Sequence, residues 1–113
     1  MAISIRDLHH RAMEHVDEAV ALRRTKKDSR NVKRLFTRAF LLERLAASWA
    51  RKEPSRSILY RSAAWMAIEA QRYADAEACA RAGLEGSPSG EFRDELKVAL
   101  ETAITRQKKK ASQ

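Results

Sequence analysis

Apolar residues recur along this chain at intervals of three and four positions, a spacing that gathers them on one face of an α-helix. The pattern predicts five helices, at about residues 4–24, 28–49, 55–71, 74–85 and 89–108. One break falls at Pro54, because the residue before a proline avoids helical backbone, and another at the Gly-Ser-Pro-Ser-Gly segment 86–90. No segment alternates as a half-buried strand does. We therefore expect an all-α fold, an antiparallel bundle or short solenoid of about five helices.

The second predicted helix is apolar over most of its circumference. The residues that follow the helical period are Val32, Leu35, Phe36, Ala39, Phe40, Glu43, Ala46 and Trp49. The residues that give it surplus apolar surface are Leu41, Leu42, Leu45 and Trp49. A helix of this kind needs neighbours on two sides. One hypothesis is therefore a mainly structural homodimer, in which this surface meets a second copy of the chain.

The segment from residue 57 to 88 carries aromatic, small and proline residues at a particular spacing. These residues are Tyr60, Ala63, Ala64, Tyr73, Ala76, Gly83 and Pro88. In this spacing the segment resembles the tetratricopeptide repeat (TPR), a helix–turn–helix unit of 34 residues. It departs from the family at Ala80, where an aromatic residue is usual, and at Gln71, where the turn glycine is usual. The resemblance implies a pair of packed helices here.

A weaker copy of the pattern lies upstream. Phe36 and Ala39 fall on its aromatic and small positions, and the pair Ala19–Val20 falls on the paired positions of the first helix. The whole is similar to small bacterial proteins with two such repeats and a capping helix. The resemblance implies a single domain over residues 1–107, with repeats at about 13–50 and 57–88, a capping helix at about 89–107, and a basic disordered tail at 108–113.

In the TPR family the first helix of each repeat lines a concave groove that holds a peptide, so the resemblance implies a non-catalytic protein-interaction module. The groove residues carried over by position are Glu14, Asp17, Ala21, Arg24, Ile58, Arg61, Trp65, Ile68 and Glu69. Arg61 and Trp65 lie four positions apart, on one helix face, where they would anchor a carboxylate-bearing peptide. The alternative is that Trp65 packs in the core.

Basic residues exceed acidic residues by 23 to 15, which gives a formal net charge of +8. The excess gathers in two segments. The first comprises Arg23, Arg24, Lys26, Lys27, Arg30, Lys33, Arg34 and Arg38, and the second Arg106, Lys108, Lys109 and Lys110. The first segment, the basic patch, is either a solvated turn or a contact for acidic proteins or nucleic acid. Without a recognition motif, nucleic acid would bind through its phosphates, and the affinity would depend strongly on salt.

Composition and spacing argue against catalysis and cofactors. At 113 residues the chain accommodates one domain. The single cysteine, Cys79, excludes an intrachain disulfide, and among alanines it is expected to be inert packing. His9, His10 and His15 do not share a helix face at metal-ligand spacing, so we expect no metal site. No apolar run could span a membrane and residues 1–7 lack a signal-peptide core, which predicts a cytoplasmic protein.

Overall fold

Five α-helices account for most of the protein, as seen in a computed structural model that describes residues 2–25 and 28–113. They are α1 (Ile5–Thr25), α2 (Ser29–Trp49), α3 (Ser55–Glu69), α4 (Tyr73–Glu85) and α5 (Gly90–Ala111). The described ranges contain no strand, and the predicted all-α fold is confirmed. Lys26 and Lys27 of the basic patch lie outside the described residues.

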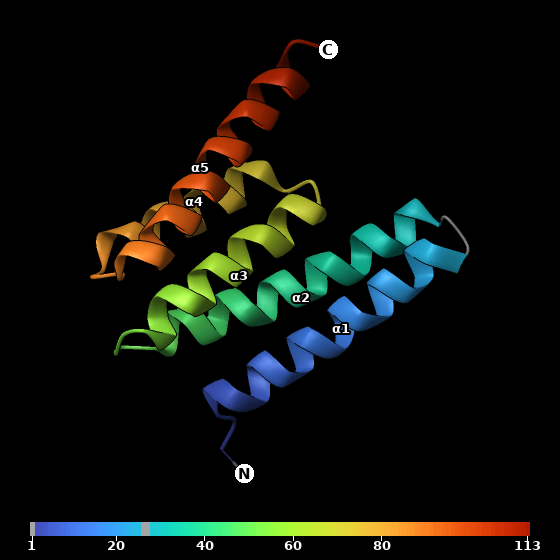
Figure 1. Ribbon diagram of the computed structural model, residues 1–113. Helices are drawn as coiled ribbons and strands as arrows, with labels where there is room; N and C mark the ends of the chain where they lie inside the picture. The colour runs from blue at the N-terminus through green and yellow to red at the C-terminus, as the bar shows by residue number, and fades with distance from the viewer. Residues whose placement is uncertain (1, 26–27) are drawn as a thin grey trace.

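The helices form a flat antiparallel array. Figure 1 shows α1, α3 and α5 running in one direction and α2 and α4 in the other. Each helix packs on the next one along the chain, and α3 also contacts α5. The Cα atoms span 40 × 39 × 20 Å, so the array is about two helices thick, given a helix diameter of about 10 Å. In so thin an array the helices keep a broad side toward solvent.

Small side chains dominate the core. One buried cluster draws residues from all five helices, including Ala12, Ala39, Ala63, Ala76 and Ala99. The largest fully buried apolar side chains are Phe40 and Leu96. A Cβ atom at Gly83 would come within 2.7 Å of Leu96 Cδ2 and 3.1 Å of Tyr60 Cβ, so this glycine lets α4 approach α3 and α5 closely. The helices therefore meet at short distances, with little room for large residues between them.

Capping side chains are found at the N-terminal ends of α1 and α2. At the start of α1 the Ser4 hydroxyl accepts from the Asp7 amide at 3.1 Å, and the Asp7 carboxylate accepts from the Ser4 amide at 3.0 Å. This reciprocal pair forms a capping box, which satisfies two amides that the first turn leaves without partners. Asp28 caps α2 by accepting from the Asn31 amide at 3.2 Å. These caps explain why α1 and α2 begin where they do.

The turn after α3 places Gln71 in the left-handed backbone region. Gln71 has a φ of 60°, and its amide donates to Ile68 O at 2.9 Å while the Arg72 amide donates to Ala67 O at 2.8 Å. These two bonds define a Schellman motif, whose left-handed position glycine usually occupies. Gln71 is also the position where the TPR pattern has its turn glycine.

The last helix differs from the expectation. It continues to Ala111, so most of the segment predicted as a disordered tail, residues 108–111, is helical. Lysine is a good helix former, and the three lysines at 108–110 lie in the last turns, where the negative end of the helix dipole favours cations.

Replacing Gln71 with glycine should stabilise the protein. A non-glycine residue in the left-handed region costs about 1–2 kcal/mol, which exceeds the entropy that glycine adds to the unfolded chain. We expect Gln71→Gly to raise the free energy of unfolding by about 0.5–1 kcal/mol in urea denaturation. Gln71→Ala is the matched control, because alanine keeps the strain. Equal stability of the two variants would contradict this assignment of the strain.

Candidate partner-binding surface

The residues predicted to line a groove on α1 and α3 are not all at the surface. The exposed members are Glu14, Asp17, Ala21, Arg24, Trp65 and Glu69. Ile58 and Arg61 are partly buried. Ile68 corrects the expectation, because only 2% of it is exposed and it packs in the core cluster that includes Ala76 and Cys79. A partner on this face would therefore meet few apolar side chains beyond Trp65.

Arg61 is held by α5. Its Nη1 donates to Glu95 Oε2, and its guanidinium lies 5.4 Å from the centre of the Phe92 ring. Both partners are on α5, so Arg61 fastens this helix to α3 through an ion pair and a cation–π contact. The group expected to bind a partner's carboxylate thus already binds a carboxylate of its own chain.

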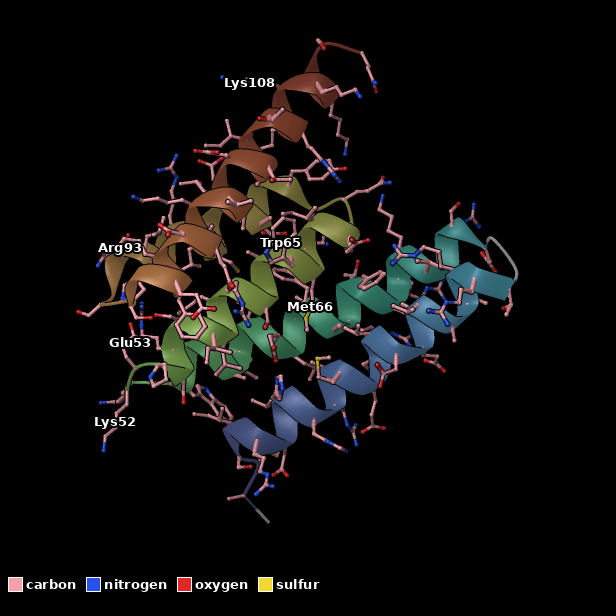
Figure 2. The ribbon with its side chains drawn as sticks, viewed as in Figure 1. Lys52, Glu53, Trp65, Met66, Arg93 and Lys108 are labelled. Carbon is pink, nitrogen blue, oxygen red and sulfur yellow. The ribbon has the colours of Figure 1, made fainter. Side chains whose placement is uncertain are left out.

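Trp65 is a surface residue. It is 36% exposed, so of the two alternatives for this side chain the structure favours the surface over the core. Figure 2 labels it on α3 together with its neighbour Met66, which is buried and belongs to the same core cluster as Phe40 of α2.

The two basic segments approach one another in space. A groove of about 360 Å³ is lined in part by Arg23 of α1, Lys33 of α2 and Arg106 of α5. Arg23 is engaged there, because it donates to Glu69 Oε2 at 2.7 Å and lies 5.3 Å from the centre of the Phe36 ring. Among the described residues, neither Lys33 nor Arg106 has a carboxylate within 4 Å. Figure 1 shows the C-terminus at the same end of the array as the start of α2.

The outer face of α2 carries an apolar stripe. Leu41, Leu45 and Trp49 recur every four residues and are 44%, 43% and 43% exposed. They account for three of the six exposed large hydrophobic residues in the described part of the chain. Leu42, the fourth surplus residue, instead packs against the core. The expectation that this helix is too apolar for one small core is confirmed for three of its four surplus residues.

A groove of about 520 Å³ runs beside this apolar stripe, between α2 and α4. Its α2 wall includes Leu41, Leu45 and Ser48, and its α4 wall is made of the small residues Ala78, Cys79 and Ala82. The stripe and the groove together form one continuous apolar surface, which we call the α2 face. It is the candidate partner-binding surface, because a large exposed apolar patch marks an interaction site more often than chance allows.

One buried carboxylate was missed as a structural residue. Glu43 of α2 is fully buried, and both of its carboxylate oxygens lie 2.9 Å from His9 Nδ1 of α1. Burial raises the pKa of Glu43, and hydrogen bonds with His9 and Ser62 oppose the rise. The signal was present in the sequence, since Glu43 shares its helical period with core residues. The pair ties α1 to α2.

The structure places the single cysteine and the potential metal ligands. Cys79 is buried, as expected, and burial raises the pKa of its thiol to about 11, so the thiol stays protonated at neutral pH. Over residues 2–25 and 28–113, no three His, Cys, Asp or Glu side chains group as metal ligands would. None of the described helices combines the length and the apolar character needed to cross a membrane.

The Glu43–His9 pair predicts a pH dependence. Because its pKa is raised from the usual 4.5, Glu43 binds its proton more tightly in the folded state. Relative to Glu43→Gln, the wild-type free energy of unfolding should be highest below that value and fall as the pH rises through the folded-state pKa. Urea unfolding between about pH 4 and pH 8 measures this difference.

The partner histidine limits the loss at neutral pH. His9→Ala leaves the buried carboxylate without its main partner and should cost about 1–3 kcal/mol. His10→Ala is the matched control, because His10 is exposed and its contact with the exposed Glu14 is long, at 3.7 Å. Similar stabilities of the His9→Ala and His10→Ala variants would show that the pair contributes nothing.

Comparisons with known proteins do not assign the chain. No family model matches it, and neither the curated proteins nor the solved structures include a significant match. The structure shows an all-helical protein of five antiparallel helices, with an apolar face on α2 and a second groove lined by Arg23, Lys33 and Arg106 together with Glu69 of α3. Its function therefore has to be argued from these surfaces.

Proposed function

We propose that this protein is a non-catalytic, TPR-like interaction module that binds a partner protein through the α2 face. The observation that carries the proposal is the stripe of Leu41, Leu45 and Trp49 beside the groove between α2 and α4. Removing a large apolar side chain from water stabilises a complex by about 1.5–3 kcal/mol. Three such residues on consecutive turns of one helix form a continuous apolar contact surface, and the tryptophan among them is of a residue type enriched in binding hot spots.

Two contacts support the TPR-like part of the proposal. Arg61 pairs with Glu95, and the Glu53 carboxylate accepts from the Ser87 amide at 3.0 Å. Both pairs join residues that are 34 positions apart, which is the length of one TPR unit. Together with the packing of α5 on α3, this spacing fits α5 as the first helix of an incomplete further repeat. In that role it caps the apolar side of repeat two.

The side of the array that includes α1 and α3 is the weaker candidate for the binding surface. Ile68 is in the core and Arg61 is paired, so Trp65 is its main remaining anchor. The α2 face offers three large apolar residues and a groove. We therefore move the proposed binding surface from α1 and α3, where the TPR resemblance put it, to α2 and α4.

Affinity capture from the source cell tests the proposal. Leu41→Ser combined with Leu45→Ser should reduce specifically captured proteins by about tenfold or more, since each lost apolar contact costs about 1 kcal/mol or more. Val98→Ser on α5 is the matched control, because Val98 is also exposed but lies outside the α2 face. Circular dichroism should show unchanged helix content. Loss of capture with Trp65→Ala but not with the double variant would return the surface to α1 and α3.

A second candidate function is nucleic-acid binding through phosphate contacts. The observation that favours it is the groove lined by Arg23, Lys33 and Arg106, which joins the two basic segments. Such binding would be independent of sequence and would weaken steeply with salt.

A titration of labelled DNA and RNA tests this candidate. Lys33→Glu combined with Arg106→Glu should lower the affinity by about tenfold or more at about 50 mM salt and reduce the slope of log K against log salt by about 2. Arg11→Glu combined with Lys97→Glu is the control for net charge, because both residues are exposed, lie outside this groove and change the net charge by the same amount. No binding at low salt, or equal binding by both variants, would rule out the groove as a phosphate site.

A further inference from the structure

We infer that the partner segment that binds the α2 face is an acidic amphipathic helix. Its apolar residues would cover Leu41, Leu45 and Trp49, and its carboxylates would pair with Arg34 and Arg38. This inference rests on the proposed function and adds the chemistry of the partner. It is carried by the order of the exposed residues along α2 and by the sign of their charge.

The basic and apolar residues of α2 form one continuous strip. Arg34, Arg38, Leu41 and Leu45 follow one another at steps of four, three and four residues, so they lie on the same side of the helix. All four are exposed. From Arg34 to Trp49 the strip is about 22 Å long, at 1.5 Å per residue, and a partner helix of about four turns would cover it. The partner therefore needs carboxylates at one end and apolar residues at the other.

Every charge that α2 exposes is positive. The exposed charged residues of this helix are Arg30, Lys33, Arg34, Arg38 and Arg44. Its one carboxylate, Glu43, is fully buried against His9 and contributes nothing to the outer face. Among the described residues, no carboxylate lies within 4 Å of Arg34 or Arg38. A partner of opposite charge would be attracted to this end and oriented by it.

The same charges disfavour a second copy of the chain as the occupant. In a symmetric dimer, parallel α2 helices would bring the basic ends of the two strips together, and antiparallel α2 helices would lay the basic end of each strip on the apolar end of the other. Like charges in a contact are destabilising. Nucleic acid does not fit this surface either, because the apolar side chains of Leu41, Leu45 and Trp49 would gain nothing from contact with a charged phosphate backbone.

The groove beside the strip suits a helix with large apolar side chains. Its α4 wall presents Ala78, Cys79 and Ala82, whose small side chains leave room for a partner leucine or phenylalanine. An amphipathic helix laid into an apolar groove is a common mode of recognition, with anchors spaced three and four residues apart. Arg44 lines the same groove, but it already pairs with Asp75 of α4 at 3.8 Å, so the charges left for the partner are those of Arg34 and Arg38.

Selection from a peptide library tests the inference without a known partner. The full chain is immobilised and exposed to phage displaying random peptides of about 16 residues, enough for four helical turns. Phage that also bind the Leu41→Ser, Leu45→Ser variant are removed. The selected peptides should be net negative, with apolar residues at spacings of three and four. Basic or neutral peptides, or peptides without that spacing, would overturn the inference while leaving the proposed function standing.

Charge reversal on the strip provides the quantitative arm. For a selected peptide, Arg34→Glu combined with Arg38→Glu should raise Kd by about tenfold or more at low salt, and the difference should shrink at about 0.5 M salt, where charges are screened. Arg11→Glu combined with Lys97→Glu is the matched control. It changes the net charge by the same amount as the test variant, but at residues on α1 and α5, outside the strip. Equal Kd values for the two double variants would overturn the inference.

Two further results would also decide against it. If every phage that binds the full chain also binds the Leu41→Ser, Leu45→Ser variant, so that none remains after the removal step, the proposed function fails together with the inference. Sedimentation of the full chain at high concentration examines the other occupant. A dimer that disappears in the Leu41→Ser, Leu45→Ser variant would show that a second copy covers the α2 face, and would overturn the inference even though the face binds a protein.

Discussion

Close approach of helices through alanine is the constraint on which this structure depends. The buried positions of α1, α3, α4 and α5 are mostly small, whereas α2 brings Leu35, Phe36 and Phe40 into the core. Such a core gains stability from many short contacts rather than from a few bulky residues. The core-facing side of α2 is already occupied by Val32, Leu35, Phe36 and Phe40. Leu41, Leu45 and Trp49 therefore lie outside, and the α2 face follows from how the core is packed.

Polar pairs between helices fix how the alanine-rich surfaces align with one another. Alanine surfaces allow neighbouring helices to slide, since one small contact resembles the next. Three pairs link particular positions of different helices: His9 with Glu43, Arg23 with Glu69, and Arg61 with Glu95. They connect α1 to α2, α1 to α3 and α3 to α5. Buried or half-buried pairs of this kind add little net stability but specify one arrangement over its neighbours, which we take to be their role here.

The helices were largely predictable from sequence, because apolar spacing and proline and glycine breaks are strong local signals. The end of α5 was expected to fray because chain termini commonly do, but the helix continues through Lys108–Lys110 to Ala111. The site was harder. The surplus on α2 pointed to Leu41, Leu45 and Trp49, whereas α3 is apolar on several sides, so spacing alone could not separate buried Ile68 from exposed Trp65. The engagement of Arg61 depends on how α5 approaches, which no local pattern encodes.

The position of Cys79 makes the rate of its chemical modification a measure of whether the groove between α2 and α4 is occupied. It is the single cysteine, it is buried, and it lies in the α4 wall of the groove beside Leu41 and Leu45. Because only 3% of the residue is exposed, a thiol-specific reagent should modify it slowly, and faster when α4 moves away from its neighbours. A molecule bound in the groove should therefore lower the rate of thiol modification at Cys79. The protein thus reports occupancy of its own surface through a native atom, with no label attached to either partner.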